Sequence, residues 1–249
     1  MRKIRFFLYC FISISVSVLG QSNYKSIKLS PDIELVKISE NAYMHVSYAF
    51  MPGFGRVGSN GLIFINEKEA LLFDTPGNDS LTQVLTSWIC DTMQFRLVGF
   101  VPNHWHDDCM GGLKYLQSIG IKTYANQMTI NIAKQKNLPV PEIGFTDSLE
   151  LRLGKKLVKC YYFGAAHSAD NIVVWVPSEQ ILFAGCMAKA ISSQNLGNTA
   201  DGDVNAYPAT IKKVYNKFGS AKVVIPGHGS LGGLELLTHT IDLAKNIKK

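Results

Sequence analysis

The feature that most constrains this chain is the segment Asn103 to Cys109, NHWHDDC, which carries two histidines and an aspartate at alternate positions. The apolar run Leu97 to Pro102 precedes it and predicts a buried strand, and two glycines soon after it predict a turn. A loop at a strand end lets His104, His106 and Asp108 point in different directions, whereas successive side chains of a strand alternate between two faces. We therefore interpret the segment as a metal site on a strand-to-helix loop, in preference to ordinary surface or core polar residues.

Three more candidate ligands, His167, Cys186 and His228, each follow an apolar run that predicts a strand and ends in small residues. Two of the six histidines, His45 and His239, lie within a predicted strand and the last predicted helix, where we expect structural roles. The candidate ligands are together sufficient for two ions. Zinc suits them because it binds imidazole, carboxylate and thiolate, and a tetrahedral site can keep one position open for water.

The first 20 residues have the layout of a secretory signal. Three basic residues within the first five positions precede the apolar stretch Phe6 to Leu19, and Gly20 supplies a small residue at the expected cleavage point. The stretch is rich in serine and shorter than the ~20 apolar residues of a membrane-spanning helix. We therefore expect cleavage after Gly20, a secreted domain over residues 21–249, and no stable membrane association after cleavage.

Charge and cysteine content restrict the possible partners and bonds. Removal of the signal lowers the formal net charge from +6 to +3, because 22 basic residues then face 19 acidic ones. No cluster of basic residues with interleaved aromatics remains, so a nucleic-acid partner is not expected. The remaining cysteines are Cys90, Cys109, Cys160 and Cys186. Two disulfides are the alternative in a secreted protein, but a domain of this size does not need them, and we favour at least one metal ligand.

Predicted strands and helices alternate along the rest of the chain, without a linker or a short repeat. Apolar runs predict strands at 33–38, 42–48, 61–65, 70–73, 97–102, 122–125, 145–153, 156–163, 172–176, 181–184 and 223–225. Helical spacing predicts helices at 80–93, 110–119, 127–135, 204–218 and 234–247. The two halves each have several antiparallel strands followed by helices, which predicts an α/β sandwich of two facing sheets with helices outside.

Residues 50–60 combine several glycines with Phe50, Met51 and Phe54. Glycine provides mobility and the apolar side chains provide contact surface, which favours a mobile binding loop. A turn whose aromatic side chains pack inward is the alternative.

Five segments resemble, in order and spacing, the motif series of metallo-β-lactamases: NHWHDD at 103–108, GAAHSADN at 164–171, GCMAK at 185–189, NLGN at 195–198 and PGHG at 226–229. They are similar to the two-zinc subclass with a three-histidine site and an Asp-Cys-His site, over essentially the whole mature chain. The resemblance implies an αββα sandwich of two mixed sheets with helices on the outer faces. It also implies two Zn²⁺ ions per chain, one on His104, His106 and His167 and the other on Asp108, Cys186 and His228.

The resemblance further implies a hydrolase that opens the β-lactam ring of penicillins, cephalosporins and carbapenems by attack of a zinc-bound hydroxide, and so confers antibiotic resistance. Asp108 and Asn198 would take part in catalysis, Asn198 by polarising the lactam carbonyl. Lys189 would pair with the substrate carboxylate, and Phe54, on a mobile flap over residues 50–58, would contact apolar substrate groups. The expected protein is a periplasmic monomer whose partners are small β-lactam molecules.

Two positions depart from the family pattern. Cys109 stands where many relatives carry a basic residue, and Ser168 replaces a commoner threonine. Asp74 and Asp170 are candidates to support the ligand loops, with ordinary turn or cap carboxylates as the alternative.

Other enzymes of the same fold are rival interpretations. Glyoxalase-like thioesterases, lactonases and nucleases carry a second histidine directly after the motif aspartate, and an aspartate that bridges the metals. Cys109 and Cys186 stand at those places and argue against them. The rival of another class is a secreted zinc-binding or sensing module without turnover, since a fold does not fix a function.

Overall fold

The structure is a computed structural model that describes residues 24–246 apart from positions 52 and 54. The predicted secretory signal at 1–20 and the predicted substrate contact Phe54 lie outside the described residues. Within the described part of the chain, no helix is both long enough and apolar enough to cross a membrane.

The amino-terminal half forms a six-stranded sheet whose strands lie side by side in chain order. They are β1 (Lys25–Ser30), β2 (Ile33–Lys37), β3 (Ala42–Met51), β4 (Gly55–Asn66), β5 (Glu69–Phe73) and β6 (Arg96–Val101). Neighbours are antiparallel except β5 and β6, which are parallel and joined by α1 (Asp79–Ser87) and a π-helical turn (Trp88–Thr92). The predicted hairpins at 33–48 and 61–73 are therefore confirmed.

The carboxy-terminal half forms a five-stranded sheet in the order β13-β12-β11-β10-β9. Its strands are β9 (Ser148–Leu153), β10 (Lys156–Tyr162), β11 (Ile172–Val176), β12 (Ile181–Gly185) and β13 (Val223–Pro226). Only β12 and β13 are parallel, and α5 (Tyr207–Lys217) lies between them in the chain, with Pro208 in its first turn, where a missing N–H costs nothing. The chain closes with α6 (Glu235–Lys245).

The segment between the two sheets contains short elements. They are α2 (Asp107–Met110), α3 (Leu113–Ser118), β7 (Tyr124–Asn126), α4 (Gln127–Gln135) and β8 (Ile143–Phe145), and β7 pairs with β8 in parallel. The helix predicted at 110–119 is the shorter α3, and the separate short helix α2, which was not predicted, ends where it was expected to begin. The helix predicted at 80–93 ends in a π-helical turn. Cys90 lies in that turn and is half-buried.

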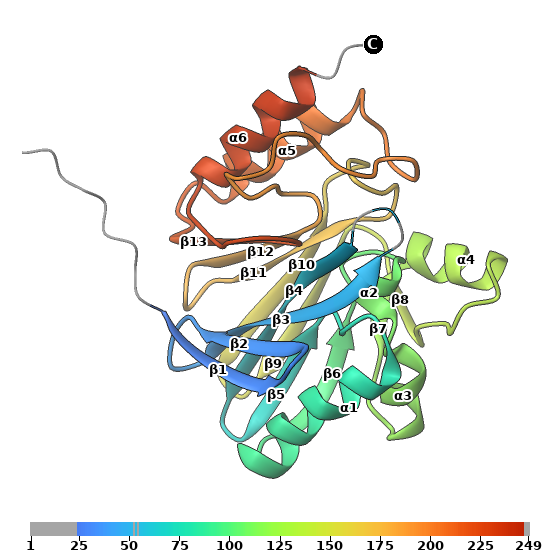
Figure 1. Cartoon of the computed structure of the whole chain (residues 1–249), viewed down its shortest axis with the longest axis vertical. Helices are drawn as coiled ribbons and strands as arrows, with labels where there is room; N and C mark the ends of the chain where they lie inside the picture. The colour runs from blue at the N-terminus through green and yellow to red at the C-terminus, as the bar shows by residue number, and fades with distance from the viewer. Residues whose placement is uncertain (1–23, 52, 54, 247–249) are drawn as a thin grey trace, which may run out of the picture.

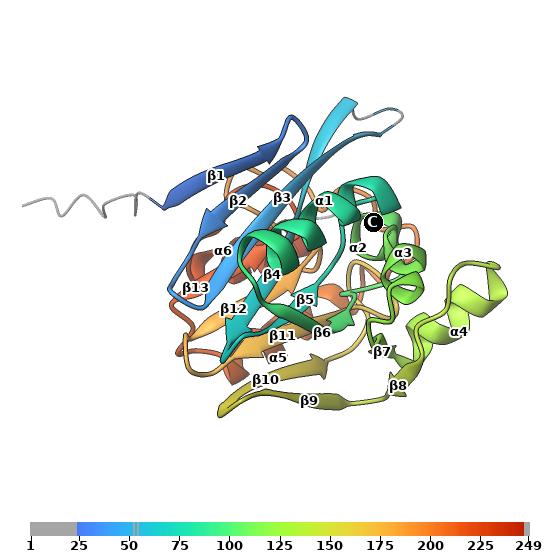
Figure 2. The same cartoon turned by 90° about the horizontal axis from the view of Figure 1, so that it is seen from below.

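Three apolar cores separate four layers, and this confirms the αββα sandwich. The central core lies between the sheets and is built from strand residues such as Phe64, Phe73, Val174 and Phe183. A second core packs α1 and α3 on the outer face of the first sheet, and a third packs α5 and α6 on the outer face of the second. Figure 1 shows these helix pairs on opposite sides of the two sheets, and Figure 2 shows the sheets from below.

The glycine-rich segment 50–60 is more regular than the loop that its composition predicts. β3 continues to Met51 and β4 begins at Gly55, with Phe50 paired to Arg56 and Tyr48 to Gly58. Arg56 donates a hydrogen bond of 2.8 Å to the carbonyl oxygen of Pro31. The ends of β3 and β4 extend beyond the other strands as a two-stranded ribbon (Figure 2), and Phe50 on this ribbon is 79% exposed.

Hydrogen bonds across the sandwich hold the strand ends of the two sheets together. Ile172 N–H donates to the Asn103 carbonyl at 2.9 Å, and the Asn103 side chain donates back to the Ile172 carbonyl. A second link joins β4 to the loop after β13, where Asn60 N–H donates to the Gly227 carbonyl at 2.8 Å. The loops after β6 and β13 are therefore each fixed to the other half of the molecule.

Asn60→Ala is expected to destabilise the fold and loosen the loop after β13. The Asn60 amide donates to the carbonyls of Pro226 at 2.9 Å and Gly229 at 2.8 Å, and the side chain is 2% exposed. The substitution leaves these carbonyl groups without a hydrogen-bond donor, which lowers the free energy of unfolding by about 1 to 3 kcal/mol. Urea unfolding of Asn60→Ala measures this loss, with the exposed Asn131→Ala as control; equal midpoints for both variants would contradict the role of Asn60.

Candidate metal centre

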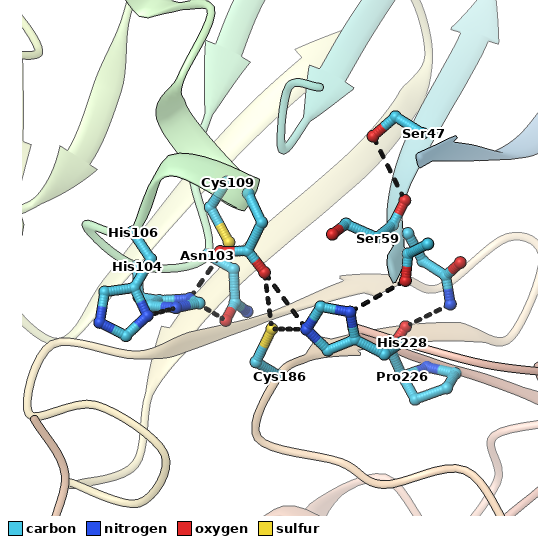
Figure 3. A network of polar contacts seen from close by, with 12 residues as sticks. Ser47, Ser59, Asn103, His104, His106, Cys109, Cys186, Pro226 and His228 are labelled. Atoms are coloured by element: carbon cyan, nitrogen blue, oxygen red, sulfur yellow. Dashed lines mark hydrogen bonds and ion pairs between the residues drawn. The ribbon is translucent and has the colours of Figure 1, made fainter. Parts of the chain in front are cut away.

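The six candidate ligands come from four strand ends that the two sheets bring to one edge of the sandwich. His104 and His106 lie in the loop after β6, and Asp108 lies in the first turn of α2. The other three follow β10, β12 and β13. Figure 3 shows the side chains of His104 and His106 next to those of Cys186 and His228.

Small residues let these loops approach closely. Gly185 has a φ of +56°, and a side chain there would meet the carboxamide of Asn103. A side chain at Gly227 would meet the sulfur of Cys186. The glycines before Cys186 and His228 are therefore required by the close packing of the ligand loops.

The three histidines His104, His106 and His167 form one cluster. Their ring centroids are 4.4, 4.8 and 5.4 Å apart, and the ring planes cross at 76°, 84° and 90°. His104 Nε2 lies 2.8 Å from His106 Nδ1, so these two nitrogens face the same point. His167 Nδ1 is buried without a hydrogen-bond partner among the described residues. The protein alone therefore leaves the nitrogens of this cluster incompletely satisfied, as expected for a metal site.

Outer contacts fix which nitrogen of two of these rings faces inward. His104 Nδ1 lies 3.3 Å from Asn103 Oδ1 and 3.2 Å from Cys109 Sγ. His106 Nε2 lies 3.0 Å from Asp201 Oδ2. These contacts engage the outward nitrogen of each ring. The inward nitrogen therefore keeps a free electron pair that can bind a metal.

Asp108, Cys186 and His228 form a second cluster. Asp108 Oδ2 lies 3.3 Å from His228 Nε2, and Cys186 Sγ lies 3.5 Å from each of these two atoms. Ligands bound at about 2.0 to 2.3 Å in a tetrahedral zinc site lie roughly 3.3 to 3.8 Å from one another. The three atoms therefore match one face of such a tetrahedron. His228 Nδ1 donates to the Gly58 carbonyl at 2.9 Å, which directs Nε2 toward the cluster.

The protonation states of the first cluster suit metal binding. Burial lowers the pKa of His104 to about 3, although the charge of Asp108 opposes this. Burial and the neighbouring His104 hold the pKa of His167 well below its usual value. Both imidazoles are therefore neutral at physiological pH and keep the electron pair that a metal requires.

The second cluster carries negative charge. A hydrogen bond from Cys109 lowers the pKa of the Cys186 thiol to about 6 against the effect of burial, with help from His228. Burial disfavours the charge on Asp108, but the hydrogen bond with His228 and the nearby imidazoles lower its pKa. The charges of Cys186 and Asp108 in turn raise the pKa of His228 in spite of burial. Two anionic groups thus face one position, which favours a cation there.

The candidate supporting residues Asp74 and Asp170 lie behind the ligand loops. The Asp74 carboxylate accepts the backbone N–H of Asn103, and the Asp74 carbonyl lies 3.0 Å from His45 Nε2. Asp170 accepts hydrogen bonds from Thr129 Oγ1 at 2.7 Å and from the hydroxyl of Ser168, next to His167. Both carboxylates are fully buried. Asp74 thus holds the backbone of the loop after β6, and Asp170 holds the side chain of Ser168 next to His167.

A cavity of about 530 Å³ opens over both clusters. Its lining includes Val57, Trp105, His106, Asp108, His167, Lys189, Asn198, Asp201 and His228. Candidate metal ligands and other polar side chains make up most of this lining, and Val57 of β4 and Trp105 add apolar surface. This composition is typical of a small-molecule site.

Lys189 and Asn198 are brought to this cavity. Lys189 is 9% exposed, burial lowers its pKa, and no carboxylate of the described residues lies within ion-pair distance of its ammonium group. Asn198 is exposed, and its Oδ1 accepts a hydrogen bond of 3.1 Å from the Ala200 N–H. The Asn198 amide nitrogen remains as a donor. An ammonium group that forms no direct ion pair within the described part of the chain and an amide donor therefore lie on the wall of one pocket.

Two residues at this site were not among the predicted ones. Asp201 contacts His106, and Trp105 forms a wall of the cavity with the ammonium group of Lys136 4.3 Å from its ring centroid. Asp201 follows Asn198 in a loop without regular structure, so only its short distance from the NLGN motif could have indicated it.

Comparisons with known proteins agree with this geometry. No protein-family profile matches the chain. The chain is 52% identical to the metallo-β-lactamase type 2 of Bacteroides fragilis over 225 residues, which cover 90% of this chain and 89% of that protein. It is 35% identical to the metallo-β-lactamase type 2 of Bacillus cereus, over 86% of this chain and 83% of that one.

Solved structures give the same result. The crystal structure of VMB-1 has a TM-score of 0.83 and 37% identity, over 87% of this chain and 98% of that one. The metallo-β-lactamase from Pontibacter korlensis has a TM-score of 0.83 and 36% identity, over 86% and 99% of the two chains. With the conserved fold and the His, Asp and Cys clusters in place, the chain belongs to the metallo-β-lactamase type 2 family.

Proposed function

We propose that this chain hydrolyses the β-lactam ring of penicillins, cephalosporins and carbapenems with two zinc ions per molecule, and so confers antibiotic resistance. The observation that carries the proposal is the Asp108, Cys186 and His228 triangle, with separations of 3.3 to 3.5 Å, beside the three-histidine cluster. His104, His106 and His167 would hold one ion, and the triangle would hold the other. Zinc, when bound, lowers the pKa of water from ~15.7 to about 7 and polarises a carbonyl group.

The residues of the chain position the substrate around these ions. Lys189 pairs with the carboxylate that β-lactams carry, and the burial of the lysine strengthens this pair. Asn198 donates its amide N–H to the lactam carbonyl and stabilises the negative charge that develops there. Asp108 takes part in catalysis because its carboxylate, a member of the second cluster, also lies within 4.8 Å of donor atoms of His104 and His106. No serine nucleophile is required, so no acyl-enzyme accumulates.

Substrate discrimination tests this proposal. Hydrolysis of a chromogenic cephalosporin by the mature protein is expected to exceed hydrolysis of a glutathione thioester, a homoserine lactone and a phosphodiester by orders of magnitude. Faster hydrolysis of any of these three would replace the proposed function with that of a rival enzyme of the fold. Zinc binding without turnover of any substrate would make the chain a binding module.

We further propose that residues 1–20 are a cleaved secretory signal and that the mature protein is a periplasmic monomer. Expression in a Gram-negative host is expected to yield a periplasmic protein whose measured mass is that of a chain beginning at Gln21. Sedimentation analysis of that protein is expected to give the mass of one chain. A cytoplasmic full-length product would contradict the signal.

Asp201→Ala is expected to lower zinc affinity at the three-histidine site by about 10- to 100-fold, because partners that orient a ligating imidazole contribute this much. Competition with a chromophoric chelator measures the affinity. Asp201→Asn keeps an oxygen that can accept the His106 N–H, and it should recover part of the loss. Unchanged affinity in the alanine variant would show that the 3.0 Å contact with His106 does not orient the ring.

A further inference from the structure

A second thiol lies at the floor of the metal centre. Cys109 occupies α2 directly after Asp108, and both Cys109 and Cys186 are buried and free of disulfides. Donor atoms of Asp108, Cys109 and Cys186 all lie within 4.8 Å of one another. Figure 3 shows Cys109 and Cys186 together with the histidines of the centre.

The proposed zinc ligands do not include Cys109. Its sulfur lies 3.2 Å from His104 Nδ1, the outward nitrogen of that ring, and within 4.8 Å of the Cys186 sulfur. The donor triangle of Asp108, Cys186 and His228 is complete without it. Cys109 is therefore an unused sulfur ligand beside a site that already has one thiolate.

A cation softer than Zn²⁺ has different affinities for these ligands. Soft ions bind thiolate in preference to imidazole and carboxylate. Two sulfurs that share one ion at about 2.3 Å or slightly more lie at most ~5 Å apart. The separation of Cys109 and Cys186 falls within this limit, and the Asp108 carboxylate can complete the set.

We infer that Cys109, Cys186 and Asp108 form a two-thiolate site for thiophilic cations such as Cd²⁺, which overlaps the second zinc position and competes with zinc there. Binding forms two metal–sulfur bonds and releases the proton of the Cys109 thiol to solvent, because Cys186 is already a thiolate at neutral pH. The inference shares Asp108 and Cys186 with the proposed zinc centre, but it does not require β-lactam hydrolysis.

Titration of the metal-free mature protein with Cd²⁺ tests the inference, with ultraviolet sulfur-to-cadmium charge-transfer absorption as readout. The wild-type signal at saturation is expected to be about twice that of Cys109→Ser, because absorption scales with the number of bound thiolates. Cys160→Ala is the matched control, since Cys160 is also fully buried but lies in the core between the sheets. This control should equal wild type.

Equal charge-transfer signals in wild type and Cys109→Ser would overturn the inference. A cadmium-113 resonance of the wild-type protein provides an independent check in case the variant does not fold, because its shift distinguishes one thiolate from two. One bound thiolate would leave the proposed zinc function intact and remove Cys109. Two bound thiolates in a protein that hydrolyses no β-lactam would leave this inference standing and remove the proposed function.

Discussion

Cys186→Ser is expected to lower the zinc content of the mature protein from two ions toward one, and to reduce kcat/KM for a cephalosporin by at least about 100-fold. Loss of an outer partner of a metal ligand already costs up to this amount, and here a ligand itself is lost. A serine hydroxyl stays protonated at neutral pH and does not replace a thiolate. The sulfur lies 3.5 Å from both Asp108 and His228, so its loss opens one corner of their triangle.

Metal analysis after gel filtration and steady-state kinetics measure these two effects. The three-histidine site should retain its ion, because none of its side chains is changed. Cys160→Ala is the control for the loss of a buried cysteine, and it is expected to keep both ions and full activity. A Cys186→Ser protein with two zinc ions and wild-type turnover would remove Cys186 from the centre.

Lys189→Glu is expected to raise KM for β-lactams by more than 100-fold while the zinc content stays normal. A hydrogen bond to a charged group contributes about 1.5 to 3 kcal/mol, which corresponds to about 10- to 100-fold in binding. Repulsion between the new carboxylate and the substrate carboxylate adds to this loss. The lysine is 9% exposed and lines the cavity, so water screens the interaction only in part.

Lys189→Met separates the loss of the ion pair from the added repulsion, because it removes the positive charge without adding a negative one and retains most of the side-chain length. Its KM should rise by about 10- to 100-fold, between wild type and the glutamate variant. The exposed Lys134→Glu is the control for a charge reversal elsewhere on the surface. A KM that stays at the wild-type value in both Lys189 variants would show that the substrate carboxylate binds elsewhere.

The layers of the fold could be predicted because each depends on local patterns. Hydrophobic runs separated by turn residues correctly predicted the hairpins at 33–48 and 172–184, and helical spacing correctly predicted α4 and α6. β1 was missing from the prediction because this edge strand, KSIKLS, has only two apolar residues. The start of α3 after Gly112, later than predicted, coincides with a close approach to α1, since a side chain at position 112 would meet Thr82. Contacts with a distant helix are not visible in local spacing.

The candidate ligands were visible in the sequence because histidine, cysteine and aspartate at strand ends are chemically distinctive. Their supporting contacts were not. Asp201 reaches His106 only because its loop folds back over the cavity, and Asn103 joins the two sheets only once they face each other. The position of Cys109 beside both His104 and Cys186 likewise depends on the turn of α2. Phe54, the predicted flap contact, stays a prediction because it lies outside the described residues.

Removal of the metal followed by stepwise return of zinc tests the central proposal most directly. The mature protein is dialysed against a chelator, and hydrolysis of a chromogenic cephalosporin is measured after each addition of Zn²⁺. We predict no turnover without metal, full recovery by two equivalents of Zn²⁺, and no recovery with Mg²⁺, which prefers oxygen ligands. Full cephalosporin hydrolysis by the metal-free protein would contradict the account.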